Sequence, residues 1–263
     1  MPQNPEARSL AVFCDFENVA LGVREAKYAQ FDMDKVLERL LLKGSIVVKK
    51  AYCDWERYKD FKAAMHAAAF ELIEIPHLRQ SGKNSADIRM VVDALDLCYT
   101  KQHVDTFVIV SGDSDFSPLV SKLRENAKTV IGVGVKNSSS DLLIANCDEF
   151  IYYDDLVRQD EQKRRAAKKR RETAPAGEDK GDKKQEAFDL FLETLQALIA
   201  ERGEGERIWG SMVKQALKRR KPGFNESYYG FKAFSDLLEE AEKRGLIKLE
   251  PDEKSGGYLV RPA

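Results

Sequence analysis

Short apolar runs alternate with segments of helical spacing through the first 157 residues of the chain. Six runs are typical of buried β-strands, at residues 10–14, 46–52, 71–75, 106–110, 129–135 and 149–153. Between them, apolar residues three and four positions apart predict helices over residues 33–42, 55–69, 86–99, 115–126 and 141–146. This repeated strand–helix–strand order predicts an α/β fold, in which a mainly parallel sheet lies between two layers of helices.

The pattern changes in the last third of the chain. Amphipathic spacing there predicts three helices, at residues 187–202, 208–217 and 228–244. Gly245 favours the end of the third helix, and two short apolar segments, 247–249 and 258–260, flank a DEKSGG turn and predict a hairpin. Three helices and a hairpin are typical of a small winged helix-turn-helix domain. We therefore expect an α/β domain, a bridge and a winged-helix domain, at residues 9–157, 158–185 and 186–263.

Charge is unevenly distributed along the 263 residues, although the net charge is only −1. It is −5 over residues 1–157, +5 over residues 158–184 and −1 over residues 185–263. The basic segment contains KRRAAKKRR at residues 163–171. This run is either a solvated helical extension that leads into a flexible linker or an arm that contacts phosphate, and one segment can do both. A net charge near zero therefore does not exclude a nucleic-acid partner.

Composition excludes several other classes of protein. No apolar run approaches the roughly 18–20 residues that cross a membrane, and residues 1–9 lack the apolar region of a signal peptide, so we expect a cytoplasmic protein. The four cysteines, at positions 14, 53, 98 and 147, include no C-x-x-C pair. A disulfide framework or a structural zinc site is therefore not expected. Cys14, Cys53 and Cys147 flank apolar stretches and are typical of small core residues.

Acidic residues directly follow two of the predicted strands. Asp15 comes after the first strand, in CDFEN, and Asp113 and Asp115 come after the fourth, in SGDSDF. Asp87 lies in the first turn of the helix that Ser85 can cap. Ligands bind beyond the carboxyl ends of parallel strands where strand order reverses, so neighbouring first and fourth strands would bring Asp15, Asp113 and Asp115 together. Asp87 could point into the same crevice from the side. Such oxygen ligands suit Mg²⁺ or Mn²⁺, which assist phosphodiester hydrolysis.

Each of these carboxylates also has a purely structural interpretation. Asp15 could cap the turn that follows it, and Asp113 and Asp115 could serve a turn and a helix start. Asp87 would be favourable at a helix N-terminus through the helix dipole alone. At the level of sequence, both interpretations stay open for all four residues.

Two further polar residues lie close to the same motifs. Asn18 could orient a water molecule or Asp15, or could only stabilise the turn. Asp93 lies six residues after Asp87, about 120° further around the helix, and could instead pair with Arg89 four residues before it. Both are kept as candidates for the site.

Four segments together resemble the NYN family of PIN-like nucleases, over about residues 9–157. They are FCDFENV at 13–19, NSADIRMVVDAL at 84–95, VIVSGDSDFSPLV at 108–120 and GVGVKNSSSDLLIANCDEFIYYDDL at 132–156. The resemblance implies a PIN-like three-layer α/β/α domain with a site for divalent metal. The positions that match the family's metal-holding acids are Asp15, Asp87 and Asp113. Asp115 matches a further acidic position, Asn18 the polar residue of the first motif, and Asp93 a frequently acidic position.

The last part of the chain resembles the OST-HTH module, also called LOTUS. The matching features are the helix near Trp209, KRRKPGFNESYYGFKAFSDLL at 218–238 and GLIKL at 245–249. Such modules resemble RNA-binding domains, some of which favour G-rich or quadruplex RNA, whereas others bind proteins. Together with the basic bridge, the candidate RNA contacts are Lys163, Arg164, Arg165, Lys168, Lys169, Arg170, Arg171, Lys218, Arg219, Arg220, Lys221, Tyr228, Tyr229 and Lys232. Either tyrosine could instead be a packing residue, and the KRRK run could be a solvated helix end.

The sequence as a whole predicts a ribonuclease that depends on Mg²⁺ or Mn²⁺, an endoribonuclease with a winged-helix module for RNA recognition. The expected partner is RNA, single-stranded or structured, and the OST-HTH module could add a protein partner. Two other functions fit the same residues. The protein could be an RNA-binding regulator whose nuclease fold is weakly active or silent, or a protein-interaction adaptor built on that fold.

Overall fold

The structure is a computed structural model of the whole chain. It describes residues 8–28, 30–75, 82–162, 183–203, 205–252 and 257–263. The chain divides into two compact units, Met1–Glu172 and Thr173–Ala263, and each unit is described by itself.

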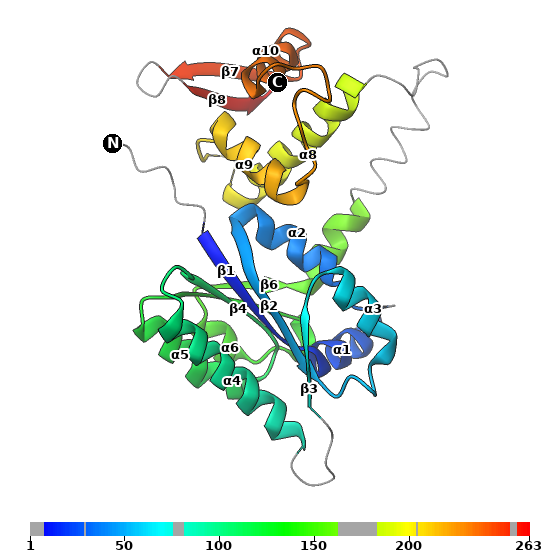
Figure 1. The fold of residues 1–263 in the computed structure, drawn as a ribbon, viewed down its shortest axis with the longest axis vertical. Helices are drawn as coiled ribbons and strands as arrows, with labels where there is room; N and C mark the ends of the chain where they lie inside the picture. The colour runs from blue at the N-terminus through cyan, green and yellow to red at the C-terminus, as the bar shows by residue number, and fades with distance from the viewer. Residues whose placement is uncertain (1–7, 29, 76–81, 163–182, 204, 253–256) are drawn as a thin grey trace. The chain divides into compact units, whose positions relative to one another are not determined.

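A six-stranded parallel sheet forms the centre of the first unit (Figure 1). Its strands are β1 (Arg8–Asp15), β2 (Gly44–Cys53), β3 (Glu71–Glu74), β4 (Thr106–Val110), β5 (Thr129–Gly134) and β6 (Glu149–Tyr152). They lie in the order β3-β2-β1-β4-β5-β6, and every neighbouring pair is parallel. The predicted parallel sheet is therefore confirmed, with the first and fourth strands as neighbours.

Helices cover both faces of this sheet (Figure 1). One layer contains α1 (Phe16–Glu25), α2 (Met33–Lys43), α3 (Lys59–Ala67) and a helix at residues 153–162. The other contains α4 (Gly82–Thr100), α5 (Ser117–Glu125) and α6 (Asp141–Asn146). Strand β1 serves both layers, because successive side chains of a strand point to opposite faces. Val12 and Cys14 belong to the first core, and Ala11 and Phe13 to the second.

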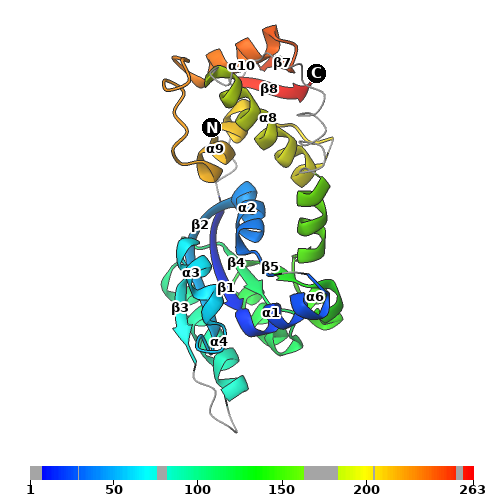
Figure 2. The ribbon, with the colours of Figure 1, turned by 90° about the vertical axis from the view of Figure 1, so that its right-hand side faces the viewer.

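Helix α1 is an element for which we expected only a turn. It begins at Phe16, directly after β1, and Figure 2 shows it where that strand ends. Phe16, Val19 and Val23 have the spacing of one helical face, and all three are buried. Asp15 caps the helix, since its carboxylate accepts the backbone N–H of Asn18. The capping interpretation of Asp15 is therefore correct, and it does not exclude a second role.

The second unit contains three helices and a hairpin, as expected for a winged helix-turn-helix domain. Its elements are α8 (Lys183–Arg202), α9 (Gly210–Arg220), α10 (Phe234–Lys243), β7 (Ile247–Asp252) and β8 (Gly257–Pro262). The two strands are antiparallel. The backbone N–H of Val260 in β8 donates to the carbonyl of Ile208, 2.8 Å away, and both side chains are buried. This bond fixes the hairpin to the residues that precede α9.

The third helix of this unit begins later than the spacing predicted. We expected it from residue 228, but α10 begins at Phe234. Gly230 has a φ of +85°, which helical residues do not adopt. The carboxylate of Asp236 accepts the backbone N–H groups of Lys232 and Ala233 and so caps the helix at this point. The apolar residues before Phe234 belong to a folded turn and not to the helix.

Within the described residues, no helix is long and apolar enough to cross a membrane. The cysteines are free thiols. Cys14 and Cys53 are buried, as expected, whereas Cys147 is only partly buried. Cys98 is buried as well, although it was not among the cysteines expected in the core.

Candidate active site

The site is built where the strand order of the sheet reverses. Strand β1 lies between β2 and β4, so the chain leaves β1 toward one side of the sheet and β4 toward the other. Cys14 is paired with Val110, and the next residues along the two strands are Asp15 and Ser111. In open parallel sheets, this crevice beyond the carboxyl ends is where ligands bind.

Asp15 is held in place by two hydrogen bonds. Its Oδ2 accepts the hydroxyl of Ser111 at 3.0 Å, and its Oδ1 accepts the backbone N–H of Asn18 at 3.3 Å. The same Ser111 hydroxyl accepts the backbone N–H of Asp113 at 3.2 Å. Ser111 is completely buried and Asp15 is 7% exposed. One hydroxyl therefore joins the acidic residue after β1 to the acidic residue after β4.

The sequence interpretation missed Ser111. Its position directly after the fourth strand, between a buried run and Gly112-Asp113, is the only signal that the sequence offers. Serine is common in turns, so its presence there does not indicate a contact with Asp15. That contact arises only because two strands far apart in the chain are paired.

The electrostatic environment of Asp15 is strongly acidic. Burial raises its pKa, and the carboxylates of Asp87 and then Asp113 raise it further. The hydrogen bonds from Ser111 and Asn18 act in the opposite direction, and the resulting pKa is about 7, against 3.8 for an ordinary aspartate. Without a cation at this position, ionising the carboxylate therefore costs free energy.

Gly112 holds the loop after β4 close to a neighbouring loop. Its N–H donates to Oδ1 of Asn18 at 2.8 Å, and its carbonyl accepts the N–H of Ser140 at 2.9 Å. A β-carbon at Gly112 would overlap the carbonyl oxygen of Ser138, so this close approach requires glycine. Asn18, a candidate for orienting a water molecule, thus links α1 to the loop that carries Asp113.

Asp113 and Asp115 lie in the same turn after β4, Asp113 at its start and Asp115 two residues later. Oδ1 of Asp113 accepts the N–H of Asp115 at 3.1 Å and caps the short 3₁₀ helix η1 (Ser114–Phe116). The side chain of Asp115 is exposed and borders an open pocket of about 460 Å³. The pocket is lined by Ser114, Asp115, Ser117, Pro118, Ser121 and Leu142. Asp115 therefore belongs to a pocket beside the buried pair of Asp15 and Ser111.

Asp93 lies among cations and not with the acidic group. It accepts hydrogen bonds from the hydroxyl of Tyr52 at 2.9 Å and from Nε of Arg89 at 3.0 Å, and Nζ of Lys50 is 3.5 Å away. Burial alone would raise the pKa of Asp93, but the bonds from Tyr52 and Arg89 and the nearby Lys50 lower it. The alternative of an Arg89 ion pair is the one that the structure displays.

The donor chemistry of the acidic group fits a hard divalent cation. Asp15, Asp87 and Asp113 supply carboxylate oxygens, the ligands that Mg²⁺ and Mn²⁺ prefer. As the side chains stand, the described part of the chain contains no three His, Cys, Asp or Glu residues grouped closely enough to hold an ion. The fit of a divalent cation therefore rests on the carboxylate ligands and on the raised pKa of Asp15. The side chains would have to move closer together for all three carboxylates to contact one ion.

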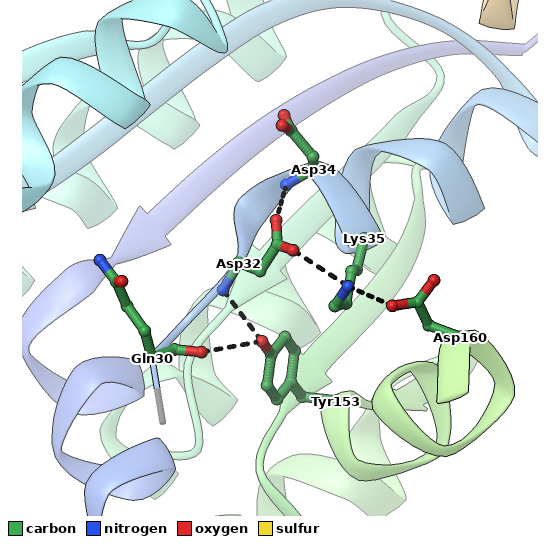
Figure 3. Close-up of polar contacts among 6 residues, drawn as sticks. All are labelled: Gln30, Asp32, Asp34, Lys35, Tyr153 and Asp160. Atoms are coloured by element: carbon green, nitrogen blue, oxygen red, sulfur yellow. Dashed lines mark hydrogen bonds and ion pairs between the residues drawn. The ribbon is translucent and has the colours of Figure 1, made fainter. Parts of the chain in front are cut away.

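A second group of acidic residues lies between α2 and the helix at residues 153–162 (Figure 3). Nζ of Lys35 bonds to Asp160 at 2.7 Å and to Asp32 at 3.0 Å. The hydroxyl of Tyr153 accepts the N–H of Asp32 at 2.9 Å and donates to the carbonyl of Gln30 at 3.4 Å. These carboxylates have a cation between them, so their arrangement serves to join two helices.

In the second unit, the candidate RNA contacts divide into exposed and internal residues. Exposed members are Lys218, Lys221, Tyr228 and Lys232. Arg220 is internal, since it pairs with Glu193 at 2.8 Å and bonds to Thr194. Tyr229 is also internal, because its ring stacks on Phe224 with centroids 5.2 Å apart. Burial and then the nearby Arg202 lower the pKa of the half-buried Arg219.

The exposed ring of Tyr228 has a cation on one face. Nζ of Lys183, at the start of α8, lies 4.3 Å from its centroid. No local sequence pattern indicates this pair, because the two residues are far apart in the chain. The seven basic candidates at 163–171 lie outside the described residues.

Two family models match this chain. The model of the NYN domain matches residues 9–154, which is more than half of the chain. The chain belongs to the NYN family. The model of the OST-HTH/LOTUS domain matches residues 188–248, so this NYN protein carries an OST-HTH domain after its nuclease-like domain. The combination of a PIN-like nuclease fold and an RNA-binding type of module indicates a nuclease-like RNA-binding protein.

Two relatives are similar to parts of this NYN protein. The uncharacterized protein MJ0482 of Methanocaldococcus jannaschii is 30% identical over 117 residues, which cover 44% of this chain and 45% of that protein. The match thus spans less than half of that relative's length. The crystal structure of VPA0982, a protein of unknown function from Vibrio parahaemolyticus, is 28% identical with a TM-score of 0.52 and covers 59% of this chain and 98% of that one. Neither name states an activity.

Proposed function

We propose that this protein is a divalent-metal-dependent ribonuclease that hydrolyses RNA phosphodiester bonds at the crevice beyond β1 and β4. The observation that carries the proposal is the environment of Asp15. Its carboxylate is buried, and the nearby carboxylates of Asp87 and Asp113 help to raise its pKa to about 7. The hydrogen bonds that it accepts come from Ser111 and Asn18, and no cation among the described residues bonds to it. A bound Mg²⁺ or Mn²⁺ would remove this repulsion.

The proposed roles follow from the contacts of each residue. Asp15, Asp87 and Asp113 would hold the metal, which supplies charge to the phosphate oxygens and lowers the pKa of a bound water molecule. Ser111 and Asn18 would position Asp15 through their two hydrogen bonds. Asp115 would act at the edge of the site, as a further metal ligand or as part of the adjacent pocket.

The proposed substrate is RNA, and two features support it. The OST-HTH domain presents Lys218, Lys221 and Tyr228 at its surface, which suits phosphate contact and base stacking. The pocket beside Asp115 has a volume of about 460 Å³ and combines hydroxyl groups with the exposed side chain of Leu142. Such a pocket is large enough for one nucleotide next to the scissile phosphate.

The test is a cleavage assay with single-stranded RNA, structured RNA, circular RNA and DNA, with Mg²⁺, Mn²⁺ or EDTA. We expect cleavage of linear and circular RNA with metal, and circular RNA reports endonucleolytic action. Asp113→Asn should be inactive, whereas Asp141→Asn, an exposed acidic residue at the start of α6, is the matched control and should retain activity. Intact RNA with both metals, or equal cleavage by Asp113→Asn, would contradict the proposal.

A non-catalytic RNA-binding regulator is the second candidate. It is favoured by the spread of the carboxylates, since the described residues contain no closed group of three metal donors. In that case, the protein would retard RNA on a native gel without shortening it, and Asp113→Asn would behave as the wild type.

A further inference from the structure

Helix α4 is apolar on two opposite faces. Met90, Ala94 and Cys98 are at most 4% exposed and pack in the core beneath the helix. On the opposite face, Ile88 and Val92 are 63% and 55% exposed. A helix that covers a sheet normally presents polar residues to water, so exposed apolar residues on its outer face indicate a candidate contact surface.

Three exposed apolar residues and one half-buried residue form a stripe along α4. The stripe consists of Ile88, Val92, Leu95 and Tyr99; Tyr99 is 59% exposed, whereas Leu95 is half-buried and also packs against the core. Their spacing of four, three and four residues is that of the contact positions of a coiled coil. At 1.5 Å per residue the stripe is about 16 Å long, and it follows a single face. Figures 1 and 2 show α4 at the outer edge of its unit.

One flank of this stripe has charges of opposite sign at its two ends. Arg89 and Asp96 each lie one residue after a stripe residue, Ile88 and Leu95, and therefore occupy the same flank. The side chain of Arg89 is 54% exposed, and its contact with Asp93 is made through Nε. Asp96 is also exposed. The positive charge is near the start of the helix and the negative charge near its end.

We propose that α4 is a dimerisation surface and packs antiparallel against α4 of a second copy of this chain. In that arrangement Ile88 meets Tyr99 of the partner subunit, and Val92 meets Leu95 of the partner subunit. The same two-fold axis places Arg89 beside Asp96 of the partner subunit, and Asp96 beside Arg89 of the partner subunit. One surface thus supplies both halves of two ion pairs, as a two-fold symmetric interface requires.

Charge argues for the antiparallel arrangement over the parallel one. In a parallel pair, residues 89 and 96 would face residues 84 and 91 of the other helix, which are asparagine and valine. Neither of these uncharged residues would complement the charge of Arg89 or Asp96. A partner of other sequence would need the same apolar spacing and the reversed charges, whereas a second copy has both. Because the stripe contains only four residues, we expect a dissociation constant in the micromolar range.

The test is sedimentation of the full chain over about 1–200 μM, with reducing agent and without RNA or metal. We expect a monomer–dimer equilibrium for the wild type. Val92→Glu should weaken the dimer by at least about tenfold, since it buries an unpaired charge at the centre of the stripe. Val47→Glu, at an apolar residue of β2 that is 48% exposed and outside the stripe, is the matched control and should leave the equilibrium unchanged.

Charge exchange separates this antiparallel pairing from any other dimer. Arg89→Glu and Asp96→Lys should each weaken the dimer about tenfold, and the double variant should restore it, with circular dichroism confirming the fold of each. A monomer at every concentration, an unchanged equilibrium for Val92→Glu, or a double variant no better than either single variant would overturn the proposal. None of these measurements depends on catalysis, so the dimer and the nuclease proposal fail separately.

Discussion

Two aspartates of the same unit, Asp15 and Asp93, differ in what surrounds them. Each accepts a hydrogen bond from a hydroxyl, Asp15 from Ser111 and Asp93 from Tyr52. Around Asp15 the charged neighbours are carboxylates, and its pKa is raised to about 7. Around Asp93 they include Arg89 and Lys50, and its pKa is lowered.

The difference shows that burial does not decide the role of an acidic residue by itself. Burial is the largest influence on both groups and raises the pKa in both. The sign of the final shift depends on whether the fold supplies a cation. An aspartate that the fold compensates is part of the structure, whereas one left uncompensated at a ligand-binding edge is a candidate for function.

The largest expected effect is on catalysis. Asp15→Asn should reduce RNA cleavage by about a thousandfold, the upper range for losing one electrostatic contact in an active site. Asp93→Asn should leave cleavage within a few fold but lower the free energy of unfolding by about 1–3 kcal/mol, because Arg89 and Lys50 lose their counter-charge. Single-turnover cleavage and urea unfolding of both variants measure the two effects.

The two variants would contradict these roles if their effects on cleavage and on stability were exchanged. Full activity of a folded Asp15→Asn protein would remove Asp15 from the proposed chemistry. A folded but inactive Asp93→Asn protein would place Asp93 in the site despite its ion pairs.

The next effect is a pH dependence of stability in metal-free protein. The pKa of Asp15 is about 7 when folded and near 3.8 when unfolded, so between these values the folded state holds a proton that the unfolded state has released. The free energy of unfolding should therefore fall as pH rises from about 4 to 7, by at most about 4 kcal/mol at about 1.4 kcal/mol per unit. Urea unfolding in EDTA at several pH values measures this slope.

Asp15→Asn is the control for that slope. The free energy of unfolding of the variant should equal that of the wild type near pH 4 and exceed it near pH 8. Mn²⁺ at pH 8 should reduce this difference in stability, because it stabilises only the wild type. Asp93 contributes in the opposite direction, since a lowered pKa gives stability that is lost in acid. Parallel pH profiles for wild type and Asp15→Asn would contradict the raised pKa.

The fold was predictable because its signals are local. Each strand of the sheet is a short apolar run, and parallel pairing follows from the helices between the runs. Helix α1 was missed although Phe16, Val19 and Val23 have helical spacing, because the motif around Asp15 was interpreted as a turn. The start of α10 was wrong because the apolar spacing continues through Gly230, where the backbone cannot be helical.

Only those site residues that directly follow a strand could be predicted from the sequence. The sequence places Asp15 and Asp113 after strands, but the bond from Ser111 to Asp15 depends on the pairing of β1 with β4. Likewise Tyr228 and Tyr229 are adjacent and chemically identical in sequence. Only packing separates them, since one ring is 59% exposed and the other lies on Phe224. Contacts between distant segments carry this information, and no local pattern reports them.

The smallest expected effect concerns the cation between Asp32 and Asp160 (Figure 3). Lys35→Met keeps the apolar stem but removes the charge, and it should lower the free energy of unfolding by less than about 1 kcal/mol without changing cleavage. The reason is exposure: the side chains of Asp32 and Asp160 are 42% and 34% exposed, so water can solvate them once Lys35 is gone. Urea unfolding and the cleavage assay check both statements. A loss above about 2 kcal/mol would mean that an uncompensated carboxylate is costly even at the surface, and the environment of Asp15 would then no longer distinguish a functional site.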